Sequence, residues 1–181
     1  MNYASEDLIN EHEGILYGLH ILEKMIEMIK NQVNISIDEL KEMVNFFKLF
    51  ADKCHHGKEE TMLFPEMEKA GIPKENGPIE QMLYEHTEGR KYIAIMDKDL
   101  QEGTISDAFT EAALQYINLL RSHINKENNI LFPMGDRRIA MDTQKHLLQA
   151  FEKYEDDVMG KGTHEKFHDL LHNLGGKYLQ E

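Results

Sequence analysis

Apolar residues recur at alternating steps of three and four along most of this chain, which is the spacing of one buried face of an α-helix. The first such run predicts a helix over about residues 5–31, and Ser5 is the expected cap at its N-terminus. The buried face of this helix is expected to consist of Leu8, His12, Ile15, Leu19, Leu22, Ile26 and Ile29. The pattern therefore places one histidine, His12, among core residues.

A second helix is predicted to begin at the capping box Ser36-Ile37-Asp38-Glu39 and to run toward Pro65, where the proline should end or kink it. Its buried face is expected to consist of Leu40, Val44, Phe47, Ala51 and His55. After a loop from Gly71 to Gly77, Pro78 is well suited to be the first residue of a third helix. The face of that helix is expected to consist of Ile79, Met82, His86, Ile93, Met96 and Leu100.

Gly103 and Ser106 mark the break before a fourth helix. One face of this helix is expected to consist of Ala112, Tyr116, Leu119, His123, Glu127 and Ile130. Two shorter helices are predicted beyond it, over about residues 142–159 and 163–174, with Gly160 and Gly162 between them. The alternation typical of β-strands is absent.

These elements predict an all-α fold, namely an up-down-up-down four-helix bundle with two additional short C-terminal helices. We expect residues 1–181 to form a single domain. Within it, the bundle should occupy about residues 5–135 and the C-terminal helices about residues 142–176.

Two stretches of the chain repeat the same pattern at one fixed offset, which is the offset that takes Pro65 to Pro133. Each copy holds a histidine and a glutamate four residues apart, which places both side chains on one face of a helix. These pairs are His55 with Glu59 and His123 with Glu127, and each copy ends in Leu-Phe-Pro. The adjacent His56 and Glu60 have the same spacing, but the second copy has Ile124 and Asn128 there, so we expect them to lie outside the ligand set.

Each repeated pair follows a helix that carries a lone seam histidine, which is His12 in the first case and His86 in the second. In a bundle, four seam positions at similar depth meet at one point. A single buried histidine is more often a core residue bonded to a nearby carboxylate. Four imidazoles and two carboxylates without a cation would, however, be a heavy uncompensated load in a bundle core. The set therefore favours a metal site.

Imidazole and carboxylate ligands suit iron or manganese, whereas structural zinc more often uses cysteines in a closed tetrahedron. Six side chains are too many for one catalytic ion but suit two. If Glu59 and Glu127 each bridge the ions, every ion has two histidines and two bridging carboxylate oxygens. A solvent-derived oxo or hydroxo bridge would then leave about one open position on each ion for a small ligand.

Composition narrows the choice of partners. The net charge of −13 disfavours nucleic acid and anionic membrane surfaces, and no apolar run is long enough for a membrane helix. The acidic N-terminal stretch does not resemble a signal peptide, and the one cysteine, Cys54, excludes an internal disulfide. We therefore expect a cytoplasmic protein without a nucleic-acid or membrane partner.

The ordered set His12, His55-x-x-x-Glu59, His86 and His123-x-x-x-Glu127, together with both Leu-Phe-Pro stretches, resembles the hemerythrin-like (HHE cation-binding) family. The resemblance covers about residues 5–135. It implies a four-helix bundle around a non-haem, carboxylate-bridged di-iron centre. By this resemblance His12 and His55 would bind one iron, His86 and His123 the other, and both glutamates would bridge.

The chain departs from the oxygen-carrying members of that family at Arg90, where the carriers have a fifth histidine. The four-His, two-Glu set instead looks like members linked to nitric oxide handling, peroxide breakdown or iron–sulfur cluster repair. Tyr116 lies on the face of His123 and is a candidate to hydrogen-bond a bound ligand, although a core aromatic with a satisfied hydroxyl is the plainer interpretation. Arg90 is expected to form a salt bridge, with Glu13 as one candidate partner.

Three functions remain open at this point. The first is a di-iron redox protein, an oxidoreductase if it turns over, that acts on dioxygen, peroxide or nitric oxide and exchanges electrons with a partner. The second is a module that senses oxygen, nitric oxide or iron, and the third is an iron-binding or iron-donor protein without turnover. Because Arg90 replaces the fifth histidine, the redox hypothesis predicts irreversible reaction with oxygen. The histidines near the C-terminus, His164, His168 and His172, are expected at the surface.

Overall fold

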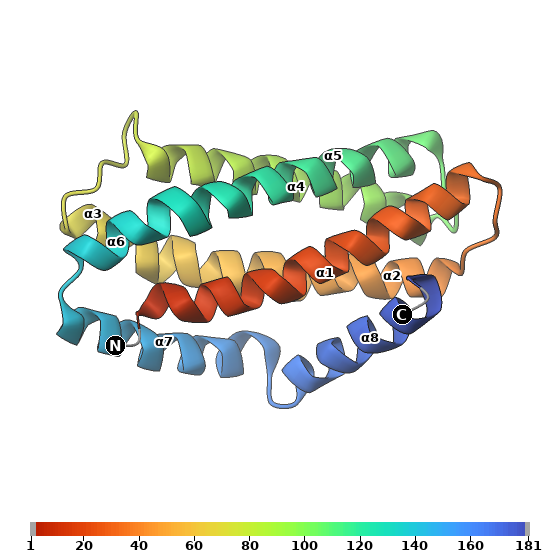
Figure 1. The fold of residues 1–181 in the computed structure, drawn as a ribbon. Coiled ribbons are helices and arrows are strands. Elements are labelled where there is room, and N and C mark those ends of the chain that lie inside the picture. Colours follow the sequence, from red (N-terminus) through yellow and green to blue (C-terminus); the bar gives the residue numbers. More distant parts are fainter. Residues whose placement is uncertain (1–2, 180–181) are drawn as a thin grey trace.

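A computed structural model describes residues 3–179, and all of its regular structure in that range is helical. The bundle consists of four long helical segments that lie side by side (Figure 1), and two of them are single α-helices: α1 (Ala4–Lys30) and α4 (Pro78–Gln101). The second segment consists of α2 (Ile37–Phe46), the π-helical η1 (Phe47–His56) and η2 (Glu59–Leu63), and α3 (Phe64–Lys69). The fourth segment consists of α5 (Asp107–Lys126), the π-helical η3 (Glu127–Leu131) and α6 (Phe132–Arg138).

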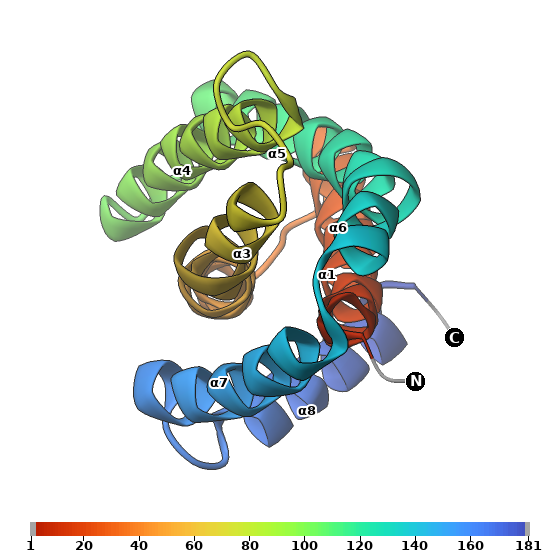
Figure 2. The ribbon, with the colours of Figure 1, turned by 90° about the vertical axis from the view of Figure 1, so that its left-hand side faces the viewer.

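Two further helices, α7 (Met141–Met159) and α8 (Thr163–Tyr178), follow the four-helix bundle. Both views place them along one side of the bundle, against α1 and the segment that begins with α2 (Figures 1 and 2). The structure thus confirms the all-α bundle that the sequence predicts. Within residues 3–179, no helix combines the length and the apolar character needed to cross a bilayer.

Three of the four predicted helix N-termini agree with the structure. The Ser36 side chain accepts a hydrogen bond from the Glu39 amide, Ser106 caps α5, and Pro78 occupies the first turn of α4. The prediction for Ser5 is wrong, because α1 begins one residue earlier, after Tyr3. The Ser5 hydroxyl instead donates to the Asp136 carboxylate at 2.8 Å, which ties the start of α1 to α6.

The sequence predicts that Pro65 either ends or kinks the second helix, and in the structure the helix does not end there. The helical backbone continues from Ile37 to Lys69 without a break, and a π turn precedes the proline. In this turn the Phe64 amide donates to the Glu59 carbonyl five residues earlier, and the Phe132 amide does the same to Glu127 in the repeat. A π turn contains one residue more than an α-helical turn. With this extra residue before each proline, the helical backbone continues through the proline.

The same π turn corrects the predicted face of the fourth helix. Ile130 was expected on the buried stripe but is 55% exposed, whereas Leu131 and Phe132 are buried in its place. One extra residue in the turn Glu127–Leu131 rotates everything beyond it relative to a regular α-helix. The 3.6-residue period therefore holds up to Glu127 and shifts after it.

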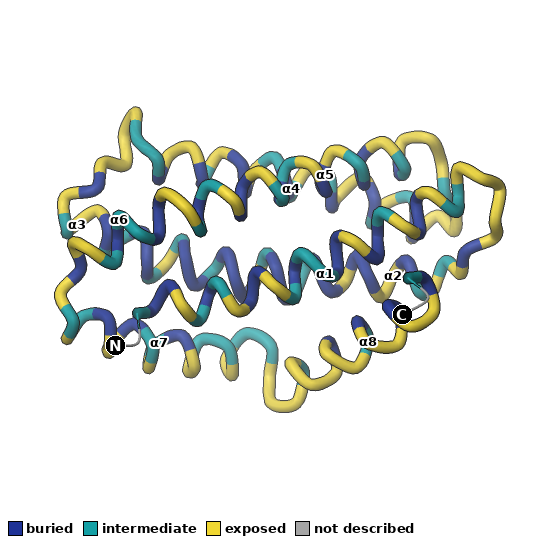
Figure 3. Tube along the Cα trace, in the orientation of Figure 1, coloured by how far each residue is buried: buried dark blue, intermediate teal, exposed yellow. Residues whose placement is uncertain are grey.

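Buried positions recur along all four long segments (Figure 3), and the apolar core consists of two separate clusters. The larger contains Ile15, Phe47, Met96 and Leu120, and the smaller contains Leu8, Leu63, Met82 and Leu131. Along each of the four segments, the buried histidines lie between a residue of the smaller cluster and a residue of the larger one. A polar layer therefore separates the two halves of the core.

The last helix, α8, packs against α1 through a close approach at Gly175. A Cβ atom at Gly175 would lie 2.0 Å from the Tyr17 hydroxyl, whereas one at the neighbouring Gly176 would meet nothing within 4 Å. Both glycines lie inside the same helix, so they form a matched pair that differs only in contact with α1.

We expect Gly175→Ala to lower the free energy of unfolding by about 1–3 kcal/mol, because Tyr17 must move out of its packed position. Gly176→Ala should raise the free energy of unfolding by about 0.5 kcal/mol, since alanine favours a helix over glycine. Urea unfolding followed by circular dichroism measures both changes. Equal effects of the two substitutions would show that α8 is not held against Tyr17.

Candidate metal centre

The structure brings all six predicted ligand residues together in the polar layer between the two apolar clusters. The four segments of the bundle each contribute to it, and each of the six residues is at most 1% exposed. The residues are His12 from α1, His55 from η1, Glu59 from η2, His86 from α4, His123 from α5 and Glu127 from η3. Both glutamates are the first residues of their π turns.

Each glutamate lies between one histidine of the first helix pair and one of the second. The Glu59 carboxylate has one oxygen 3.5 Å from Nε2 of His55 and the other 3.4 Å from Nε2 of His86. Oε2 of Glu127 lies 3.3 Å from Nε2 of both His12 and His123. Each carboxylate therefore lies beside donor nitrogens from both helix pairs.

The outer nitrogen of each of these histidines is already occupied. Nδ1 of His55 lies 2.7 Å from Glu11, and Nδ1 of His123 lies 2.9 Å from Glu85. Nδ1 of His12 lies 2.7 Å from the Asn128 side-chain oxygen, and Nδ1 of His86 lies 2.7 Å from Glu60. Because these side-chain oxygens accept hydrogen bonds, every Nδ1 carries the proton and every Nε2 presents a lone pair.

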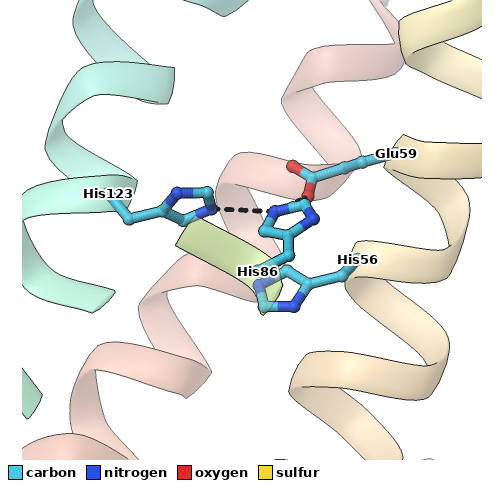
Figure 4. A group of neighbouring side chains, drawn as sticks. All are labelled: His56, Glu59, His86 and His123. Atoms are coloured by element: carbon cyan, nitrogen blue, oxygen red, sulfur yellow. Dashed lines mark hydrogen bonds and ion pairs between the residues drawn. The ribbon is translucent and has the colours of Figure 1, made fainter. Parts of the chain in front are cut away.

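The inner nitrogens converge on positions that lack a protein donor. Nε2 of His86 lies 3.1 Å from Nε2 of His123 (Figure 4), and with both outer nitrogens protonated these are two lone pairs facing each other. Two imidazoles bound to one cation at about 2.1 Å and roughly at right angles would have their nitrogens about 3.0 Å apart. The observed separation therefore fits two ligands of one cation.

Several buried polar atoms at this point have no hydrogen-bond partner within the described residues. They are Nε2 of His12 and His55 and both carboxylate oxygens of Glu59 and Glu127. Burial and the nearby Glu127 raise the pKa of Glu59 well above its usual range, and burial lowers the pKa of His55 and His86 well below theirs. Such a set is unfavourable alone, and cations satisfy all of it at once. The residues thus fit a two-cation centre.

The two halves of the centre share a second layer of ionic contacts. Nζ of Lys58 donates to Glu11 at 2.6 Å, and Nζ of Lys126 likewise donates to Glu85. The offset between Lys58 and Lys126 is the same as that between the two His-x-x-x-Glu pairs. The repeat seen in the sequence therefore includes the groups that orient the histidines, because each lysine holds the carboxylate that holds a histidine.

A further histidine, His56, is buried beside this layer, although the repeat predicts that it lies outside the ligand set. His56 is 4% exposed, and its ring stacks on that of His86 with 3.8 Å between centroids. The side chains of His56, Glu59, His86 and His123 offer donor atoms within 4.8 Å of one another (Figure 4). The adjacent Glu60 holds Nδ1 of His86. The adjacent histidines His55 and His56 are visible in the sequence, but the second copy of the repeat has no histidine at the position that corresponds to His56.

The structure also places the remaining candidates. Arg90 pairs with Asp52 and Glu60, each at 2.7 Å, rather than with Glu13. Tyr116 is a buried aromatic as expected, but its hydroxyl has no hydrogen-bond partner within the described residues, contrary to the expected satisfied hydroxyl. Cys54 is fully buried, and burial raises the pKa of its thiol to about 12. The C-terminal histidines His164, His168 and His172 are exposed, as predicted.

Hollows approach the centre from two sides. A cavity of about 310 Å³ is lined by Glu11 together with residues of α7 and α8, including Glu155 and His164. A second cavity of about 350 Å³ is lined by Asp52 and Arg90 with Lys48 and Asp97. Neither cavity includes the six ligand candidates. Each cavity instead reaches a carboxylate that contacts the outer nitrogen of a buried histidine. In the first cavity this is Glu11, beside His55, and in the second it is Asp52, beside His56.

The fold and the buried histidine–carboxylate layer define a helical-bundle protein that binds metal cations. The family of the hemerythrin HHE cation-binding domain matches residues 4–135, and this chain belongs to that family. Two uncharacterised proteins, one of Mycobacterium bovis and one of Mycobacterium tuberculosis, are each 24% identical over 166 residues. The alignments cover 87% of this chain but only 63% of those relatives. No solved structure matches the chain.

The two lysines of the second layer differ in burial, which makes them a matched pair for a stability test. Lys58 is 1% exposed and contacts Asp7, Glu11 and Glu155, whereas the Lys126 side chain is 33% exposed. Although burial alone would lower it, Glu11 and Asp7 raise the pKa of Lys58 above its ordinary value. Lys58 is therefore charged and is the one cation among three carboxylates.

We expect Lys58→Met to lower the free energy of unfolding of the metal-free protein by about 3 kcal/mol, because it leaves buried carboxylate charge without its cation. Lys126→Met should lower it by less than about 1 kcal/mol, because water can reach Glu85 when the exposed lysine is removed. Urea unfolding measures both. Losses of the same size would show that burial of Lys58 does not set the strength of its contacts.

Proposed function

We propose that this protein is a non-haem di-iron protein that binds or reacts with a small ligand, namely dioxygen, peroxide or nitric oxide, at a His4Glu2 centre. The observation that carries this proposal is the doubled donor set. Two histidines stand on each side of two glutamates, and each glutamate contacts one histidine from either side. Six side chains are too many for one catalytic ion, which must keep a position open for its ligand, but they suit two ions.

The donor chemistry supports iron. Imidazole and carboxylate ligands suit Fe²⁺ and Fe³⁺, with manganese as the nearest substitute, and within residues 3–179 no cysteine joins the set. In this proposal His12 and His55 hold one ion, His86 and His123 hold the other, and Glu59 and Glu127 bridge them. When bound, the iron pair supplies two adjacent redox-active ions for the chemistry of a small ligand.

The protein residues around the centre would fix the ligands and exclude water. Glu11 and Glu85 hold the protonated nitrogens of His55 and His123, and these contacts raise the basicity of the inner nitrogens. Phe132 stacks on the ring of His12 with 5.6 Å between centroids, which places an apolar ring against one face of that imidazole. The ligand atoms are thus held in place before the metal binds.

This rigid setting favours a resident cofactor over an iron-donor role. A donor must release its iron readily, but here all six ligands are buried and each histidine is held by an outer hydrogen bond. A redox protein or a sensor requires such retention. Whether the protein converts its ligand in repeated cycles distinguishes a redox protein from a sensor.

The first prediction of this proposal concerns metal content. After iron-replete expression, we expect about two irons per chain, because four imidazoles and two bridging carboxylates suit a pair of ions. His55→Ala and Glu59→Ala should each reduce iron to less than about one per chain. His168→Ala is the matched control, since His168 is exposed, and it should retain the full content. Elemental analysis giving one iron in the unaltered chain, or zinc alone, would contradict the proposal.

The second prediction separates redox chemistry from storage and sensing. The iron-loaded protein should consume hydrogen peroxide in many equivalents per chain while keeping its iron, and the reduced protein should bind nitric oxide with a change in its optical spectrum. The metal-poor His55→Ala protein serves as the control for free iron. Stoichiometric reaction with iron release would indicate an iron donor, and ligand binding without consumption of peroxide would indicate a sensor.

A further inference from the structure

The 310 Å³ cavity beside Glu11 is enclosed by three parts of the chain: α1, the junction of α2 with η1, and the C-terminal helices α7 and α8. Figure 2 shows α7 and α8 along one side of the bundle, next to α1. The lining of this cavity contains none of the six ligand candidates, so the cavity is separate from the metal centre. Its volume lies at the lower end of the range of small-molecule sites, about 300–1,000 Å³.

Part of the lining is aromatic and apolar. Phe46, Phe50, Phe167 and Leu171 line the cavity, and each of them is at most 8% exposed. The rings of Phe46 and Phe50 are stacked with 5.3 Å between centroids, and the ring of Phe167 meets them at angles of 76° and 69°. Such a cluster of aromatic rings offers apolar contact area and also attracts cations through the ring quadrupoles.

The charged part of the lining is acidic. Asp7, Glu11, Glu13 and Glu155 line the cavity, and no lysine or arginine is among the described residues that do so. Behind the lining, Nζ of Lys58 lies 2.6 to 3.3 Å from three of these carboxylates. One lysine against four carboxylates leaves a formal charge of −3 around the cavity, with its imidazoles neutral. This charge repels anions and favours a cationic occupant.

A glycine in the middle of α1 keeps the cavity open. Gly14 lines it, and a Cβ atom at that position would meet nothing within 4 Å. Gly18, one turn further along the same helix, differs because a Cβ atom there would lie 2.7 Å from the ring of Phe46. Packing therefore requires a glycine at position 18 but not at position 14. Glycine inside a helix costs stability, and at Gly14 its effect is to leave space beside the aromatic rings.

A bare metal ion is a poor occupant of this region. The side chains of Glu11, Cys54 and Glu155 do offer donor atoms within 4.8 Å of one another. Nζ of Lys58, however, already donates to Glu11 at 2.6 Å and to Glu155 at 3.1 Å, so an ammonium group occupies the place of a cation between them. Burial also raises the pKa of the Cys54 thiol to about 12, which disfavours the thiolate that a metal requires. The aromatic rings, in addition, contribute nothing to the coordination of a metal ion.

We propose that this cavity binds a small organic ammonium ion, with its apolar groups against the aromatic rings and its charge compensated by the surrounding carboxylates. This site goes beyond the proposed function, because its occupant is not the small ligand of the metal centre. The two sites adjoin at Glu11, which lines the cavity and accepts a hydrogen bond from Nδ1 of His55 at 2.7 Å. An occupant therefore lies beside a contact that orients one ligand histidine, which is the position of an effector rather than of a substrate.

The first test compares two probes of the same shape by isothermal titration calorimetry on the unaltered chain. Choline carries a quaternary ammonium group, and 3,3-dimethyl-1-butanol has a neutral carbon in its place. We expect choline to bind at least about 10-fold more tightly, because only the cation interacts with the carboxylates and the ring quadrupoles. Equal affinities, or no binding of choline at millimolar concentrations, would overturn the inference. Calcium ions that displace choline at equal concentration would also overturn it, because they would indicate a site made of carboxylates alone.

Because none of the ligand candidates lines the cavity, the preference for choline should be the same in the iron-loaded and the metal-free protein. The titration is therefore independent of the iron content. Absence of choline binding with two irons per chain would overturn this inference and leave the di-iron proposal intact. Choline binding without two irons would do the opposite.

The second test fills the cavity. We expect Gly14→Leu to weaken choline binding by at least about 10-fold, because the leucine side chain takes up the open space. Gly176→Leu is the matched control, since Gly176 also lies inside a helix with nothing within 4 Å of an added Cβ but does not line the cavity. Both variants should fold, because leucine favours a helix over glycine. Unchanged choline affinity in a folded Gly14→Leu protein would overturn the inference.

The third test removes one charge from the lining. We expect Glu13→Gln to weaken choline binding by about 3-fold and to leave the affinity for the neutral alcohol unchanged, because a solvent-exposed carboxylate contributes a modest attraction. Glu152→Gln is the control, since Glu152 is exposed on α7 and does not line the cavity. Equal losses of choline affinity in the two variants would indicate a general charge effect and contradict binding in this cavity.

Discussion

The structure depends on a layer of buried imidazoles whose outer nitrogens are all engaged by side-chain oxygens. This constraint forces the inner nitrogens to present lone pairs to one another, and Nε2 of His86 and His123 come within 3.1 Å. With the unpartnered oxygens of Glu59 and Glu127 added, the layer is electrostatically incomplete without cations. The layer is buried between the two apolar clusters, which favours metal ions over solvent as the partners of its unpaired atoms.

The π turns adjust the helices to this layer. Glu59 and Glu127 each begin a π turn, and the amides of Phe64 and Phe132 donate to their carbonyls. A π turn adds one residue, which carries the chain past the following proline and re-aims the apolar residues beyond it into the smaller cluster. The Leu-Phe-Pro stretches thus follow from the need to hold a glutamate in the layer and still complete the core.

The sequence by itself determined the fold class, the helix pattern and the six converging ligand candidates. This worked because apolar periodicity reports which face of a helix is buried, and the histidines occur in phase with it. Lys58 and Lys126 share the offset of the internal repeat, but only the structure shows that they contact Glu11 and Glu85. Local pattern was sufficient wherever a residue's role follows from its own helix face.

Only the tertiary structure decided the remaining features, because they depend on contacts between segments. The pairing of Glu11 with His55, and of Arg90 with Asp52 and Glu60, joins residues 30 to 44 positions apart that no single helix brings together. The burial of His56 beside this layer depends on its stacking against His86, a histidine from another helix. The exposure of Ile130 follows from a π turn, which leaves no trace in apolar periodicity until the helix has been built.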